Sequence, residues 1–66
     1  MKNSLKVERA IKNITQEELA KQIGVTRQAI NSIELGKYVP STILALKLSR
    51  YFNKGVNEIF TLEETD

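Results

Sequence analysis

The chain has 66 residues, a formal net charge of +2 and a hydrophobic content of 41%. It contains no cysteine and no histidine, which excludes disulfide bonds and the usual Cys/His zinc sites. Its apolar runs are much shorter than the roughly 20 residues that a membrane-spanning helix needs.

Charge is distributed unevenly along the chain. Residues 1–60 hold ten basic and five acidic side chains, whereas the last six residues, TLEETD, hold three acidic side chains and no basic one. A basic body with a short acidic tail suits a polyanionic partner, although such surfaces are also common without one. The opening MKNSLKVERA lacks the apolar core of a secretory signal, so we expect a cytoplasmic protein.

The first predicted helix runs from Leu5 to about Lys12, with Asn3 or Ser4 as its cap. Its apolar residues do not form a single stripe, so we expect two partly buried faces. Leu5 and Arg9 lie on one side, and the other side holds Val7, Ala10, Ile11 and Ile14.

The second and third predicted helices follow each other closely. TQEE starts the second helix, because Thr15 and Glu18 have the spacing of a capping box, and Gly24 is suited to end it. Thr26 caps the third, which extends to about Leu35. A helical wheel turns Ile30, Ile33 and Glu34 inward, turns Gln28, Asn31 and Ser32 outward, and places Arg27 at the rim.

The remainder of the chain predicts a loop and two further helices. GKYVPS is the loop, and Ser41 caps a helix over Thr42–Phe52. NKG ends that helix, and Asn57 is expected to cap a last turn through Phe60. No segment alternates with period two, so the fold class is all-α with five helices in one domain, residues 1–66.

The 20 residues from Gln16 to Leu35 have the spacing of a helix-turn-helix. Ala20 is small where the two helices cross, Gly24 allows the turn, and Ile30 and Ile33 hold the third helix on the second. The outer side of the third helix is then free to enter the DNA major groove, which is about 12 Å wide. An ordinary helical hairpin would not explain the polar outer side.

Three segments resemble the Xre family of Cro- and phage-repressor-like helix-turn-helix regulators: TQEELAKQIGVTRQAINSIELGKY, PSTILALKLSRYFN and VNEIF. The resemblance covers about residues 5–60, leaves an acidic tail over residues 61–66, and implies a five-helix lambda-repressor-like domain. Within the family the chain looks like the small members that are little more than the DNA-binding domain. No nucleophile–base set or nucleotide-binding loop is evident, so we expect no enzymatic activity, cofactor, metal or small-molecule effector.

The resemblance also implies roles for individual residues. Many family members bury a salt bridge between helices 1 and 3 at the positions of Arg9 and Glu34. Arg27 suits guanine O6 and N7, and Gln28 suits the edge of adenine. The positions that match DNA-contacting positions of the family are Gln16, Thr26, Arg27, Gln28, Asn31, Ser32 and Lys37.

Three positions depart from the family pattern. Glu8 replaces a residue that is usually apolar, and Leu35 stands where asparagine is common. Thr42 and Ile43 reverse the usual order of an apolar and a charged residue, so Ile43 is expected to be exposed.

These observations predict a sequence-specific regulator, most simply a repressor, that binds an inverted repeat in double-stranded DNA as a homodimer. The alternative is an antitoxin or adaptor that binds another protein. Candidates for the dimer interface are Val56, Ile59, Phe60 and Ile43, with Val7 and Ile11 as a further possibility. Some small relatives pair their chain ends, which predicts strands at Met1–Asn3 and Thr61–Leu62.

Overall fold

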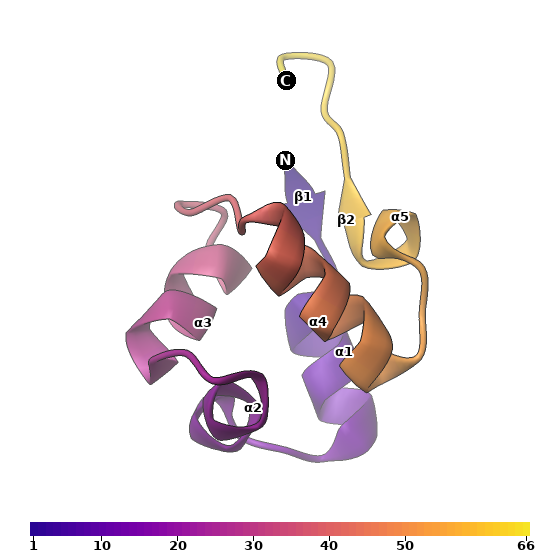
Figure 1. The fold of residues 1–66 in the computed structure, drawn as a ribbon. Helices are drawn as coiled ribbons and strands as arrows, with labels where there is room; N and C mark the ends of the chain where they lie inside the picture. Colours follow the sequence, from indigo (N-terminus) through magenta and orange to yellow (C-terminus); the bar gives the residue numbers. More distant parts are fainter.

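A computed structural model describes all residues, 1–66, and contains five helices and a two-stranded ribbon (Figure 1). None of the helices is long and apolar enough to cross a bilayer. In chain order the elements are β1 (Lys2–Asn3), α1 (Leu5–Lys12), α2 (Gln16–Ile23), α3 (Arg27–Glu34), α4 (Thr42–Phe52), α5 (Val56–Ile59) and β2 (Phe60–Thr61).

One hydrophobic core holds the elements together. Helices α2 and α3 pack directly against each other, and α4 packs against α2 and α5. The eleven buried apolar side chains are Leu5, Leu19, Ala20, Ile23, Ile30, Ile33, Leu44, Leu48, Phe52, Ile59 and Phe60. Because α1 contributes only Leu5 to this set, polar contacts must supply much of its attachment.

The predicted caps of three helices are confirmed. The Thr15 hydroxyl accepts a hydrogen bond from the Glu18 N–H at 3.1 Å, and the Glu18 carboxylate accepts one from the Thr15 N–H at 3.0 Å. The hydrogen bond from the Thr15 backbone N–H, and then the Thr15 hydroxyl, lower the pKa of the Glu18 carboxyl. Thr26 and Ser41 cap α3 and α4 in the same way, at 3.1 and 3.2 Å.

The expected start of the last helix was wrong. Helix α5 begins at Val56 with Gly55 as its N-cap, two residues before the predicted cap at Asn57. The Glu58 carboxylate accepts a hydrogen bond from the Gly55 N–H at 2.6 Å, and this contact sets the earlier start.

Helix α1 has one buried face, not two. Leu5 and Glu8 are buried, while Val7 and Ile11 are exposed, so the expected apolar cluster on the other side is not buried. Two polar contacts lie on the buried side of α1. Glu8 accepts a hydrogen bond from Lys54 Nζ at 2.9 Å, and Arg9 pairs with Glu34.

The chain ends meet in an antiparallel ribbon, with Lys2 opposite Thr61 and Asn3 opposite Phe60. A ribbon was predicted, but its second strand lies one residue earlier than expected and leaves Leu62 exposed. Beyond the ribbon, the Met1 ammonium lies 3.1 Å from carboxylate oxygens of both Glu63 and Asp66. Hydrogen bonds to Asp66 first, and then to Glu63, raise the pKa of this amino group.

Candidate nucleic-acid interface

The turn between α2 and α3 has the geometry that the spacing predicted. Ala20 is buried where the two helices pack. Gly24 ends α2 with φ of 85°, in the left-handed region that favours glycine. Ile30 and Ile33 are fully buried and hold α3 against the core, so its opposite side is free to carry polar residues.

The candidate DNA-contacting residues lie on α2, on α3 and on the loop after α3. Arg27 and Gln28 are exposed on the first turn of α3, and Asn31 and Ser32 are half-buried one turn later. Thr26 is exposed, but its hydroxyl already accepts the capping hydrogen bond from Ala29. Beyond α3, Lys37 is exposed in the loop over residues 35–41. These residues offer both charged and neutral polar groups to a ligand.

The ion pair between α1 and α3 is present. Arg9 Nε and Nη2 donate to the two oxygens of Glu34 at 2.6 and 3.1 Å, and the two side chains are 15% and 5% exposed. Arg9 Nη1 also donates to the Ile14 carbonyl oxygen at 3.0 Å. This bidentate ion pair fixes the guanidinium plane and joins α1 to α3.

The pair shifts the pKa values of both partners. The hydrogen bonds to Glu34 raise the pKa of Arg9 above its ordinary value. Burial alone would raise the pKa of Glu34, but the hydrogen bonds from Arg9 and Gln16, together with the Arg9 charge, outweigh burial and lower it. Glu34 is therefore a carboxylate at neutral pH.

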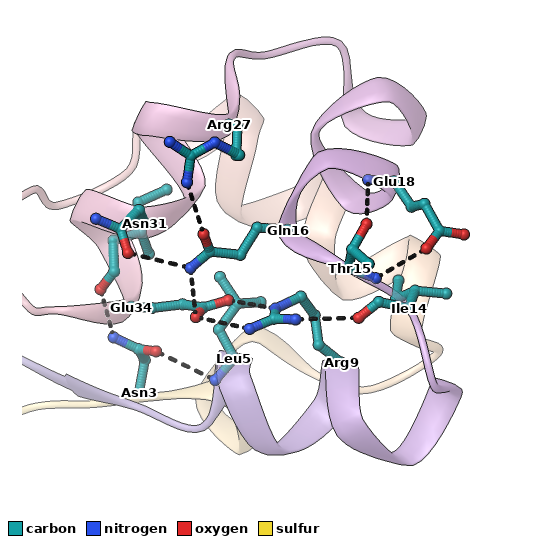
Figure 2. A network of polar contacts seen from close by, with 11 residues as sticks. Asn3, Leu5, Arg9, Ile14, Thr15, Gln16, Glu18, Arg27, Asn31 and Glu34 are labelled. Atoms are coloured by element: carbon teal, nitrogen blue, oxygen red, sulfur yellow. Dashed lines mark hydrogen bonds and ion pairs between the residues drawn. The ribbon is translucent and has the colours of Figure 1, made fainter.

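Gln16 connects this ion pair with the first turns of α3 (Figure 2). Its Nε2 donates to Glu34 Oε1 at 3.0 Å and to Asn31 Oδ1 at 3.1 Å. Its Oε1 accepts from Arg27 Nη1 at 3.3 Å. The network therefore runs from α1, through Glu34 and Gln16, to two candidate DNA-contacting residues.

Both hydrogens of the Gln16 amide are thus used inside the protein. In this arrangement the Gln16 NH2 group is not free to donate to DNA, although the family resemblance places Gln16 among the DNA-contacting positions. The backbone N–H groups of Gln16 and Glu17 remain, because the first turn of a helix has no partners for them inside the helix and the Thr15 cap takes only that of Glu18. They adjoin an open depression lined by Arg9, Arg27 and Glu17 among others, in which the Arg9 charge is already paired with Glu34.

The structure corrects part of the expected dimer interface. Ile59 and Phe60 are 1% and 6% exposed and belong to the core of the single chain, so they are not left over for a second copy. Val56 is half-buried against the same core. Ile43 is exposed as expected, and Val39 and Leu46 are exposed apolar residues in the adjoining loop and on the same helix.

Sequence reasoning missed the second role of Asn3. Its Oδ1 accepts from the Leu5 N–H at 3.1 Å, and its Nδ2 donates to the Ile33 carbonyl oxygen at 2.8 Å. Asn3 was expected only as a possible cap of α1. The bond to α3 joins residues 30 positions apart, and no local pattern indicates it.

A family model described as helix-turn-helix matches residues 5–59. The chain is 50% identical over 66 residues to an uncharacterized HTH-type transcriptional regulator of Methanocaldococcus jannaschii, with full coverage of both chains. It is 47% identical over 64 residues to the regulator YgzD of Bacillus subtilis, covering 97% of each. It is also 40% identical over 53 residues to the transcriptional activator BcrR of Enterococcus faecalis, covering 80% of this chain and 26% of that protein.

Proposed function

Because the chain belongs to the helix-turn-helix family of transcriptional regulators, we propose that it is a repressor that binds an inverted-repeat operator as a homodimer. Helix α3 enters the major groove, and α2 lies across the phosphate backbone. Repression is proposed because blocking a promoter needs only tight binding at an operator. The activator BcrR matches over about a quarter of its length, so its name says little about the sign of regulation here.

The observation that carries this proposal is the two-sided character of α3. Ile30 and Ile33 are buried behind the helix, while Arg27 and Gln28 are exposed on its first turn. A surface helix that needed only to be soluble could carry any polar residues. Arg and Gln are the side chains that pair with guanine and adenine edges through two hydrogen bonds each.

Phosphate contacts are proposed at both ends of the motif. The start of α2 offers free backbone N–H groups, and the positive end of the helix dipole lies there. Lys37 offers a positive charge on the loop after α3. Contacts of this kind position a protein on DNA without reading its sequence.

A second copy of the chain is proposed to pack on the exposed apolar patch formed by Val39, Ile43 and Leu46. An apolar groove lined by Pro40, Ala45 and Phe60 among others adjoins this patch. The patch includes the loop that directly follows α3, so a two-fold axis there keeps both reading helices near the dimer centre. One copy alone makes too few contacts for a selective site.

Alanine substitutions test the reading helix against the phosphate contacts. On a cognate site, Arg27→Ala or Gln28→Ala should cost about 1–3 kcal/mol and relax preference at one base pair. Lys37→Ala should weaken binding to all sequences alike and reduce the slope of affinity against salt by about 1. If Arg27→Ala and Gln28→Ala left both affinity and preference unchanged, α3 would not be the reader.

A second candidate is an adaptor or antitoxin that binds another protein. The observation in its favour is that Val7 and Ile11 are exposed one turn apart on α1, outside the apolar patch on α4. Substituting aspartate for both would abolish binding to a protein partner on α1 and would leave DNA affinity unchanged. Loss of DNA affinity in this variant would argue against a separate protein-binding surface.

A further inference from the structure

We infer that Asn31 presents its NH2 group to DNA as a hydrogen-bond donor, and therefore prefers guanine or thymine to adenine at the base pair it reads. This inference rests on the proposed function and adds to it the kind of base edge that one residue recognises. It follows from the direction of each hydrogen bond in the network of Figure 2.

The donor and acceptor of each hydrogen bond in the network are determined first at Glu34. Its carboxylate is paired with Arg9 at 2.6 Å and is ionised at neutral pH, so it can only accept hydrogen bonds. The Gln16 atom that lies 3.0 Å from Glu34 Oε1 must therefore be the NH2 group. Oxygen at that position would face a negatively charged oxygen.

The other end of the Gln16 amide agrees with this orientation. Arg27 Nη1 lies 3.3 Å from Gln16 Oε1, and a guanidinium can only donate. The amide thus has an acceptor-only group on its nitrogen side and a donor-only group on its oxygen side. Turning it over would break both contacts, so the orientation is fixed by two independent partners.

The orientation of Gln16 then fixes that of Asn31. The second hydrogen of Gln16 Nε2 is donated to Asn31 Oδ1 at 3.1 Å. The oxygen of Asn31 therefore faces Gln16, and its Nδ2 points away from that contact (Figure 2). What Asn31 offers outward is an NH2 group with two hydrogens.

The outward-facing NH2 group of Asn31 changes which base it can recognise, because a free asparagine usually reads adenine. It donates to N7 and accepts from the N6 amino group, which requires its oxygen to face the base. With the oxygen turned toward Gln16, the two-bond pair with adenine is lost, and the NH2 group is what faces the base. Guanine presents two neighbouring acceptors, O6 and N7, and thymine presents O4. Adenine presents N7 beside the N6 donor, and cytosine presents a donor, so both match an NH2 group less well.

The test compares sequences selected from a random duplex library by wild type and by four variants. Asn31→Ala identifies the base pair that Asn31 reads, as the position where preference is lost. We expect wild type to prefer guanine or thymine there. Gln16→Ala frees the Asn31 oxygen and should raise adenine relative to guanine and thymine at that position by at least about fivefold.

Asn31→Asp and Gln22→Ala complete the comparison. The carboxylate introduced by Asn31→Asp would present only acceptors, so the preference should move to cytosine or adenine. This near-isosteric change keeps the test valid should Gln16→Ala impair folding. Gln22 is an exposed glutamine on the same helix as Gln16 that makes no contact in the network, so Gln22→Ala should select the wild-type sequence.

Several results would overturn the inference. They are a wild-type preference for adenine or cytosine at this position, no position that responds to Asn31→Ala, or an unchanged preference in both Gln16→Ala and Asn31→Asp. A library in which wild type enriches no sequence would instead overturn the proposed function, and the inference with it. An adenine at the Asn31 position within a clear motif would overturn only the inference.

Discussion

At the scale of single residues, Glu34 of α3 receives hydrogen bonds from both α1 and α2. It accepts hydrogen bonds from Arg9 and Gln16 and is 5% exposed. Glu34→Ala would leave the Arg9 guanidinium mostly buried without its partner, so we expect a loss of about 3–5 kcal/mol in the free energy of unfolding. Urea unfolding followed by circular dichroism measures this loss.

Glu17→Ala is the matched control for that substitution. Glu17 is an exposed glutamate on α2 outside the network, and its removal should change stability by no more than about 0.5 kcal/mol. If Glu34→Ala unfolded at the same urea concentration as Glu17→Ala, the ion pair would not support the fold.

The pH dependence of stability follows from the lowered pKa of Glu34. Its pKa in the folded protein lies below that of an unfolded chain, which is about 4.3. The stabilisation is therefore complete above that pH and is lost as pH falls through the folded pKa. In Glu34→Gln the fall in stability below about pH 4.3 should be shallower than in wild type.

Thermal unfolding between neutral and acidic pH measures both slopes. Glu18 and Asp66 also have lowered pKa values, so the variant should keep some dependence on pH. Equal slopes in the two proteins would mean that Glu34 does not contribute to acid unfolding.

At the scale of elements, a buried glutamate of α1 is paired with a lysine from a distant loop. Glu8 is 8% exposed and its partner Lys54, in the α4–α5 loop, is 41% exposed. The two substitutions should therefore act differently. Lys54→Ala leaves a buried carboxylate without its partner and should cost about 1–3 kcal/mol. Glu8→Leu leaves a lysine that can be hydrated, and should be neutral or stabilising.

Equilibrium unfolding of both variants checks this asymmetry. If Lys54→Ala and Glu8→Leu lost the same free energy of unfolding, stability would depend on the Glu8–Lys54 ion pair and not on how well the remaining partner is hydrated. A stabilising Lys54→Ala would contradict the buried position of Glu8.

The helix ends could be predicted from sequence because each depends on residues only a few positions apart. Thr15 and Glu18, Thr26 and Ala29, and Ser41 and Leu44 are all three residues apart. The last helix was placed wrongly although its cap is also local, because Glu58 and not Asn57 satisfies the free backbone N–H.

The contacts between elements could not be predicted in this way. Glu8 and Lys54 are 46 positions apart, and no local pattern indicates that they meet. Arg9 and Glu34, 25 positions apart, could be paired only through the family resemblance. The orientation of the Gln16 amide could not be predicted either, because it depends on Glu34 and Arg27, which lie on another helix, 18 and 11 positions away.

At the scale of the whole molecule, the proposed selective binding to DNA rests on two copies of the chain. Leu46 in the proposed interface is 56% exposed, so Leu46→Asp should fold normally and remain monomeric in sedimentation at micromolar concentration. Val7→Asp is the control, because Val7 is 57% exposed but lies on α1. If Leu46→Asp formed the same dimer as Val7→Asp, the interface would lie elsewhere.

The most direct test of the central claim is selection of bound sequences from a random duplex library by the purified wild-type protein. We predict one enriched inverted repeat, with half-sites about 10–10.5 bp apart from centre to centre. An enriched site without two-fold symmetry would contradict the dimer, and the absence of any enriched sequence, even at low salt, would contradict sequence-specific DNA binding.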